Sequence, residues 1–246
     1  MIRFFLTCTS QARLGFSALL IGALSFGAQS VRAQQFVVDD AGITDPGACQ
    51  FEAWLGESAG WVLPACTLIS RTELTLGIGY ADERHGDHTD RQVEYVAQAK
   101  VNFLPDAPGG LGVSAVVGFG FGPFAQATGV PVEGLFAYVP ATYILPGERA
   151  IFHANAGWSV ETERNLHRLV YGFRNDVVLH ERATVIGEIF GEGQDLGVQG
   201  GLRLSIIADL FLIDASYGAA LSGDAPDIGF AIGIAITPPR FFTPIR

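Results

Sequence analysis

Long segments in which apolar and polar residues alternate constrain the fold of this chain more than any other feature. Residues 93–103, VEYVAQAKVNF, carry apolar side chains at every odd position and mostly polar ones at the even positions. The same period of two recurs over 73–80, 111–121, 152–159, 198–206, 211–217 and 228–237. Successive side chains of a strand point to opposite faces of a sheet, so the pattern predicts β-strands with two unlike faces.

The length of these runs indicates which kind of β-protein the chain forms. Turn residues delimit twelve runs, at 49–57, 61–68, 72–81, 92–104, 111–123, 135–145, 150–160, 168–179, 183–190, 197–207, 210–221 and 228–237. Most are longer than the strands of about five or six residues typical of soluble proteins. They match the roughly nine to eleven residues of a tilted membrane-spanning strand, and single-chain bacterial barrels have an even strand number.

Composition agrees with a membrane barrel. The chain has 31 glycines in 246 residues and a positive mean hydropathy, yet beyond its N-terminus no 18 consecutive residues are apolar, which argues against spanning helices. Aromatic residues fall near the ends of the runs: Tyr80, Phe121, Trp158 and Tyr217 at one rim, and Phe103, Phe152 and Phe211 at the other. The alternative is that they fill an ordinary core. We predict an all-β fold, a transmembrane antiparallel up-and-down β-barrel of about twelve strands.

Residues 1–33 have the features of a secretory signal peptide. Arg3 and Arg13 precede an apolar stretch, 14–26, that two glycines interrupt. The stretch is too short to span a bilayer comfortably as a transmembrane anchor. The small-residue site at 31–33 then precedes Gln34. We therefore predict a cleaved signal at 1–33 and a bacterial outer-membrane location.

The remaining chain divides into an N-terminal extension, 34–48, and the barrel itself, 49–246. The sequence leaves open whether the extension lies in the lumen or in the periplasm. Connections at 70, 105–110, 146–148, 181–182 and 208–209 are tight, whereas those at 82–91, 125–134, 161–167 and 191–196 are longer. The tight set is expected at the periplasmic rim and the longer set outside the cell.

Charge and cysteine content limit the partners. Removing residues 1–33 takes away three arginines and no acid, so the formal net charge goes from −10 to −13, which argues against nucleic acid as a partner. Cys49 and Cys66 remain, in a compartment where disulfides persist. A hairpin turning at 58–60 brings them nearly opposite each other, so we predict a disulfide; two free thiols are the alternative.

Alternation assigns a set of polar side chains to the lumen: Glu52, Glu73, Glu94, Gln98, Lys100, Asn102, His153, Asn155, Arg174, Asp176, Glu188, Gln199, Arg203 and Asp214. Asp176 is expected nearly opposite Glu188, with Arg174 close by. Mixed charges in one layer should pair, because an unpaired charge in a narrow lumen is costly. These pairs either hold the barrel together or set its selectivity. Twelve strands lie between a filled barrel and an open porin, so a narrow, partly occluded pore is predicted.

Metal binding and hydrolysis are both weakly supported by the sequence. His85 and His88 lie in an acidic stretch with Asp82, Glu83, Asp87 and Asp90, but their spacing fits no established zinc pattern, and a solvated acidic loop is the simpler interpretation. An outer-membrane hydrolase needs a serine beside a histidine, and the sequence around His153 supplies none. We therefore expect no enzyme activity, no metal and no cofactor.

Short segments of the chain resemble a known family. FVVDDAGITDPGACQFEAWLGES, ELTLGIGY, GEIFGE and LFLIDASYG are similar to the outer-membrane β-barrel family labelled after the meta-pathway of phenol degradation. The resemblance implies an outer-membrane barrel and uptake of aromatic or other small organic compounds. The chain departs from many such barrels at its end, where Phe241 and Phe242 are followed by four more residues.

The sequence thus predicts a small-solute channel, with outer-membrane lipid, the barrel-insertion machinery and small organic solutes as its partners. A structural or adhesion barrel that presents loops is the first alternative. A hydrolase is the second.

Overall fold

The computed structural model describes residues 35–240, apart from 86–87, 123–131 and 223–227, together with residues 242 and 243. These residues form twelve strands: β1 (Cys49–Gly56), β2 (Ala59–Ile69), β3 (Thr72–His85), β4 (His88–Leu104), β5 (Leu111–Phe121), β6 (Gly134–Ile144), β7 (Ala150–Glu161), β8 (Leu166–His180), β9 (Ala183–Glu192), β10 (Asp195–Ile207), β11 (Phe211–Ser222) and β12 (Gly229–Ile236). Among the described residues, no helix has the length and apolar character needed to cross a membrane.

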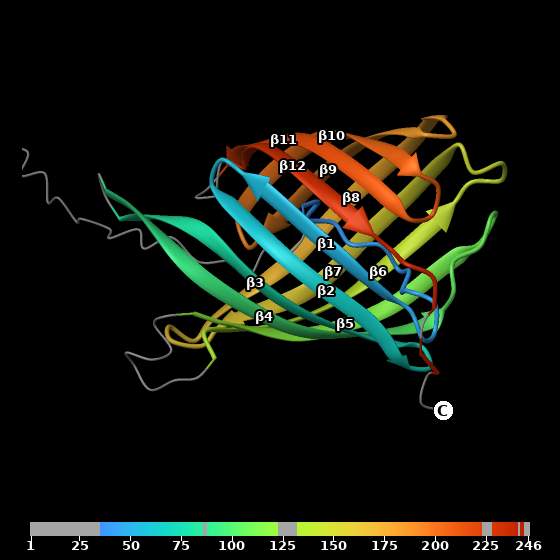
Figure 1. The fold of residues 1–246 in the computed structure, drawn as a ribbon. Helices are drawn as coiled ribbons and strands as arrows, with labels where there is room; N and C mark the ends of the chain where they lie inside the picture. The colour runs from blue at the N-terminus through green and yellow to red at the C-terminus, as the bar shows by residue number, and fades with distance from the viewer. Residues whose placement is uncertain (1–34, 86–87, 123–131, 223–227, 241, 244–246) are drawn as a thin grey trace, which may run out of the picture.

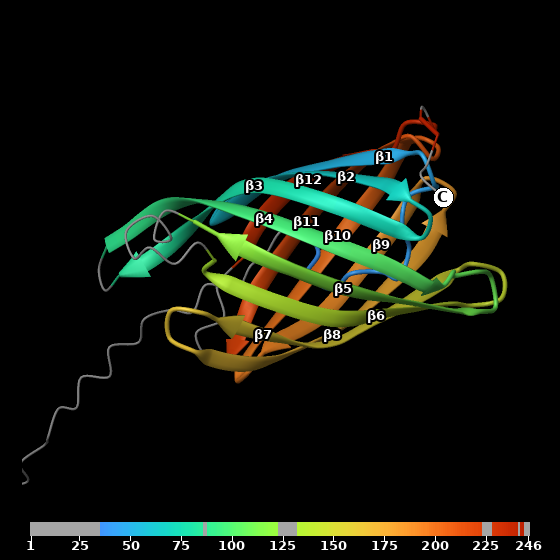
Figure 2. The same ribbon diagram turned by 90° about the horizontal axis from the view of Figure 1, so that it is seen from below.

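The strands form one closed antiparallel barrel (Figures 1 and 2). Each strand pairs with its neighbour in sequence, and β12 returns to β1 with Glu52 opposite Ala235. Because the number of strands is even, this closing pair is antiparallel like all the others. The predicted all-β, up-and-down barrel of about twelve strands is confirmed. We call the end with residues 70–71, 105–110, 145–149, 181–182 and 208–210 the turn rim, and the opposite end the loop rim.

The stretch 82–91, expected as a loop, is mostly strand. β3 continues to His85 and β4 begins at His88, so the hairpin extends well beyond its neighbours (Figure 1). Asp82 lies opposite Arg91, whose Nε is 2.7 Å from the Asp82 carboxylate. Charged side chains lack the apolar alternation that marks a membrane strand, so the sequence pattern missed this projecting part. The side chains of 83–90, which include the candidate metal ligands His85 and His88, lie outside the described residues.

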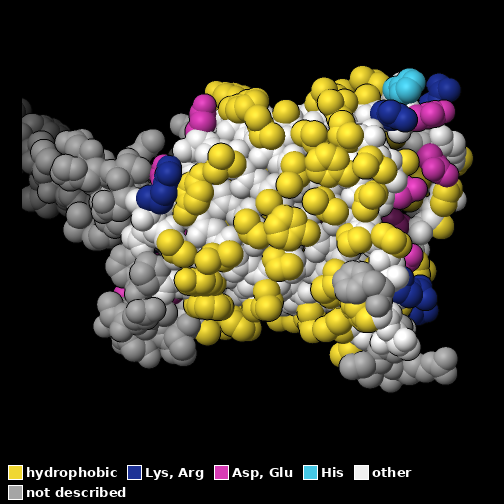
Figure 3. Space-filling model, in the orientation of Figure 1, with side chains coloured by type: hydrophobic (Ala, Val, Ile, Leu, Met, Phe, Trp, Pro, Cys, Tyr) yellow, Lys and Arg dark blue, Asp and Glu magenta, His cyan; other side chains and the backbone are white. Residues whose placement is uncertain are grey.

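The outer surface of the barrel is an apolar belt. Exposed large apolar side chains occur on all twelve strands; examples are Leu76, Val117, Leu169 and Ile232. In Figure 3 they cover the middle of the molecule, while charged side chains gather toward the two ends. Trp158 and Phe103 are exposed near opposite ends of their strands, where aromatic girdles are expected. Hydrocarbon is the medium in which such a belt is stable.

Cys49 and Cys66 form the predicted disulfide, with an S–S distance of 1.99 Å. They are register partners on β1 and β2. Cys49 has the same parity as Phe51, so the bridge lies on the outer face of the barrel, beside the turn rim. It joins the first strand to the second where the chain enters the barrel wall.

The apolar belt predicts a depth-dependent cost for a buried charge on β5. Val117→Arg, near the middle of the strand, is expected to lower the free energy of unfolding by about 2–4 kcal/mol, because guanidinium desolvation is greatest at the bilayer midplane. Leu111→Arg, at the turn rim on the same face, should cost only about 0–1 kcal/mol. Urea unfolding in lipid vesicles measures both, and equal costs would contradict a lipid-facing wall.

Candidate functional site

Residues 35–48, here called the plug segment, lie inside the barrel rather than below it. From the turn rim, where Cys49 begins β1, the segment runs back into the lumen (Figure 1). Phe36, Val38 and Ala41 have exposed fractions of 4%, 1% and 0%. The sequence left open whether this segment lies in the lumen or in the periplasm, and in the structure it lies in the lumen.

The first part of the plug segment is held by two charged side chains of the wall. The Glu188 carboxylate accepts hydrogen bonds from the backbone N–H groups of Val37 and Val38, at 2.8 and 3.0 Å. Arg174 Nη1 donates to the Val38 carbonyl at 3.2 Å. Because a buried peptide group without a partner is costly, these side chains stabilise an irregular backbone that no strand pairs with.

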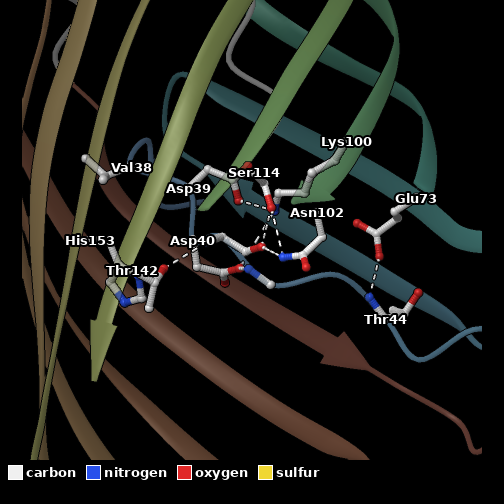
Figure 4. Close-up of polar contacts among 12 residues, drawn as sticks. Val38, Asp39, Asp40, Thr44, Glu73, Lys100, Asn102, Ser114, Thr142 and His153 are labelled. Carbon is white, nitrogen blue, oxygen red and sulfur yellow. Dashed lines mark hydrogen bonds and ion pairs between the residues drawn. The ribbon is translucent and has the colours of Figure 1, made fainter. Parts of the chain in front are cut away.

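In the middle of the plug segment, both the N–H and the C=O of Ala41 form hydrogen bonds to side chains of the wall. Its N–H donates to Thr142 Oγ1 at 2.8 Å, and its carbonyl accepts from Asn102 Nδ2 at 2.8 Å and from Ser114 Oγ at 2.5 Å (Figure 4). Asn155 lies against the neighbouring part of the segment, where its amide, oriented to match, bonds the backbone N–H and C=O of Asp39 at 2.8 and 2.9 Å. The wall therefore binds this peptide much as a receptor binds an extended ligand.

The last part is fixed by Thr44. Its N–H donates to the Glu73 carboxylate at 2.8 Å (Figure 4). Its hydroxyl lies 2.8 Å from that of Thr67. Glu73, Thr67 and Thr44 are all buried. The plug segment is thus tied to β3 and β2 just before it joins β1.

A buried ion pair links the plug segment to β4. Lys100 Nζ is 2.9 Å from Asp39 Oδ1, with both side chains buried, and the hydroxyl of Tyr138 donates to Asp39 Oδ2 at 3.0 Å. The second carboxylate, that of Asp40, is 3.7 Å from Lys100 and keeps 47% of its side chain exposed. One lysine therefore faces two acids of the plug segment.

Two arginines of the wall form their own pairs and enclose an aromatic ring. Arg174 contacts Asp176 through two hydrogen bonds of 2.6 and 2.5 Å, and Arg203 contacts Asp214, its register partner, at 2.8 and 2.9 Å. Both guanidinium groups face the ring of Phe36, at 5.3 and 5.8 Å from its centroid. The contacts combine charge pairing with cation–π attraction.

The expectation that Asp176 lies nearly opposite Glu188 differs from the structure by two positions along β8. Arg174, not Asp176, lies opposite Glu188, and Asp176 lies opposite Ile186. A register shift between Val178 and His180, beside the β8–β9 turn, displaces the pairing by one residue. Such an irregularity leaves no mark in an alternating pattern.

The other residues assigned to the lumen divide into two groups. Gln199 donates to the Gln35 carbonyl at 2.9 Å, so it also contacts the plug segment, while Glu52 and Gln98 line the cavity beside it. Glu94 lies on the inner side of β4 toward the loop rim, opposite Gly79. The site residues that the sequence analysis missed are Thr67, Ser114, Tyr138 and Thr142. Strand parity places each of them on an inner face, and that signal was present in the sequence.

Thr142, His153 and Asp176 are of the residue types used by hydrolases, but they are arranged to hold the plug segment. Thr142 Oγ1 accepts the Ala41 N–H, and it lies 2.9 Å from His153 Nδ1. His153 Nε2 is 3.7 Å from Asp176, beyond hydrogen-bonding range. All three are buried, and the Thr142 hydroxyl is already bonded to the plug segment. Among the described residues, no group of three or more His, Cys, Asp or Glu side chains is placed to hold a metal ion.

A cavity of about 480 Å³ lies beside the plug segment. It extends from Asp45 and Thr237, near the turn rim, to Trp54 and Phe36 deeper in the barrel. Its lining includes Ala235 of β12, whose small side chain leaves room there. Polar and charged side chains make up much of its lining, so water and polar solutes suit it.

Comparison with known proteins finds one family model and solved outer-membrane barrels of similar fold. A family model described as "Uncharacterised conserved protein UCP029691" matches residues 20–237. A "KdgM porin" is similar in structure, with a TM-score of 0.57 and 7% identity over 77% of this chain and 98% of that one. The same porin "in complex with disordered oligogalacturonate" has a TM-score of 0.58, at the same identity and coverage.

A third solved structure has a similar fold. The "COG4313 outer membrane channel" from Pseudomonas putida F1 has a TM-score of 0.53 and 11% identity, over 80% of this chain and 97% of that one. No curated protein sequence matches the chain. At these identities the solved structures establish the fold. Together with the closed barrel and its apolar belt, they show the architecture of a bacterial outer-membrane protein.

Removing the Glu188 carboxylate tests how the plug segment is held. In Glu188→Ala the N–H groups of Val37 and Val38 lose their acceptor, at a cost of about 1–3 kcal/mol. Hydrogen–deuterium exchange over residues 35–48 should therefore accelerate by about tenfold or more. Glu181→Ala, at the exposed β8–β9 turn, is the matched control and should leave exchange unchanged. Unchanged protection in Glu188→Ala would contradict this contact.

Proposed function

We propose that this chain, which belongs to the family described as Uncharacterised conserved protein UCP029691, is a narrow, passive outer-membrane channel for small solutes. The geometry of its lumen is the basis for this function. The observation that carries the proposal is the cavity of about 480 Å³ between the plug segment and the wall. The cavity is lined by polar groups within a closed apolar belt, which is the arrangement that conducts polar solutes across hydrocarbon.

The plug segment sets the width of this channel. It lies within the lumen and leaves space between itself and the wall, for example beside Glu52 of β1, Gln98 of β4 and Ala235 of β12. We propose that the lumen residues have two tasks. Glu188, Asn102 and Glu73 position the segment through its backbone, while Glu52 and Gln98 line the path that remains.

The nature of the cargo is part of the proposal. The resemblance to the family named after the meta-pathway of phenol degradation suggests small aromatic or other organic compounds. A porin of similar fold, solved with oligogalacturonate, supports passage of an organic solute through a barrel of this kind. The width left by the plug segment favours molecules much smaller than a polysaccharide.

The proposal includes export through a cleaved signal at 1–33. The mature chain then begins at Gln34, directly before the first described residue of the plug segment. A free N-terminus of this kind allows the segment to occupy the lumen without threading a longer chain through it.

A barrel that presents surface loops is the second candidate. The β3–β4 hairpin favours it, because it projects beyond the other strands at the loop rim (Figure 1). A purely structural barrel needs no water path, so conductance separates the two functions.

The channel is tested by recording from the full chain in planar bilayers. The wild type should give a small, steady conductance, and deletion of residues 35–46 should raise it severalfold because the lumen is then unobstructed. A double variant, Asp39→Ala with Glu188→Ala, keeps the chain length and should give frequent large openings. Absence of current in all three proteins would overturn the channel function and leave the structural barrel.

A further inference from the structure

The charges around the cavity are unbalanced. Lys100, Arg174 and Arg203 line it, and each already has a carboxylate partner: Asp39, Asp176 and Asp214, respectively. The acids that remain are Glu52, Asp45, Asp106 and Glu73, which accepts the Thr44 N–H, with Asp40 3.7 Å from the shared Lys100. A solute in the cavity therefore meets an excess of negative charge.

Glu52 is the clearest case of this imbalance. It belongs to the wall formed by β1, β2 and β12, and among the described inward-facing residues of these strands it alone is charged. Within the described part of the chain its carboxylate has no ion pair and no hydrogen bond. Across the cavity the half-exposed carboxylate of Asp40 projects from the plug segment. Two acids thus face the same space from opposite sides.

An aromatic surface lies beside Glu52. Trp54 is the next inward residue of β1, about 7 Å farther along the strand, and it packs against a buried cluster formed by Trp61, Leu63 and Val96. The Trp54 indole Nε1 is buried and has no partner among the described residues. Gly77 leaves space for this cluster, since a Cβ there would lie 2.6 Å from Leu63 and from Val96.

These two features together indicate a class of solute. A carboxylate attracts a positive charge and repels a negative one, and acidic side chains at a constriction are the usual basis of cation selectivity. A tryptophan face attracts an ammonium group or packs against an apolar ring. We propose that the cavity favours small cations, and among them organic ammonium compounds with an aromatic or apolar body, with Glu52 and Trp54 as the specificity-determining residues.

This inference rests on the proposed channel function and is tested by reversal potentials in planar bilayers with the full chain. In a KCl gradient, K⁺ should be more permeant than Cl⁻ by about threefold or more. Glu52→Gln, which breaks no contact in the described structure, should lower this ratio by about twofold or more. Glu181→Gln removes an equal charge at the exposed β8–β9 turn and should leave the ratio unchanged.

The second arm uses a matched pair of probes, 4-hydroxybenzylammonium and 4-hydroxybenzoate, which differ mainly in the sign of their charge. The ammonium compound should be the more permeant of the two. Trp54→Leu should lower its permeability relative to K⁺ by about twofold or more while leaving the K⁺/Cl⁻ ratio unchanged.

The outcomes separate the two claims. Equal permeability of cations and anions, preference for 4-hydroxybenzoate, or a Glu52→Gln protein that behaves like the wild type would overturn the inference while leaving a channel. Cation preference with no effect of Trp54→Leu would overturn the role of the aromatic surface. No current from any variant would overturn the channel function and the inference with it.

Discussion

The buried backbone of the plug segment needs hydrogen-bond partners, and most of the polar side chains of the lumen serve to supply them. Its N–H and C=O groups lie inside the barrel, where no strand pairs with them and where burial without a partner is costly. The missing partners come from strands far apart in sequence, through the side chains of Glu188, Arg174, Asn102 and Glu73. The polar inner face is therefore a binding surface for the chain's own N-terminal peptide.

Ion pairing stabilises the charged side chains that are buried between the plug segment and the wall. Lys100 with Asp39, and Arg174 with Asp176, are buried pairs whose members each make more than one polar contact. Removing one partner would leave an uncompensated charge, which is more costly than losing both. The pairs neutralise the basic side chains, and that is why the remaining acids dominate the electrostatics of the cavity.

The asymmetry of side-chain size determines where space is left. The small side chain of Ala235 leaves room for the cavity beside the plug segment, while Trp61, Leu63 and Val96 pack together as a buried cluster. The barrel is thus neither filled nor open. The space that remains in the lumen depends on the volumes of a few side chains and not on the backbone of the barrel.

Alternation in the order of residues was enough to predict the barrel and its inner face, because strand parity identifies Lys100, Arg174 and Glu188 as inward-facing. The disulfide was predictable too, since a tight hairpin brings Cys49 opposite Cys66. What the inner face binds depends instead on long-range contacts: the plug segment has no periodicity, and its bonds join positions as far apart as 37 and 188. The register of β8 on β9, the projecting β3–β4 hairpin and the cavity beside β12 likewise depend on a bulge, on charge pairing and on packing volumes. A period of two specifies which face a side chain occupies, and the folded chain alone specifies what that side chain meets there.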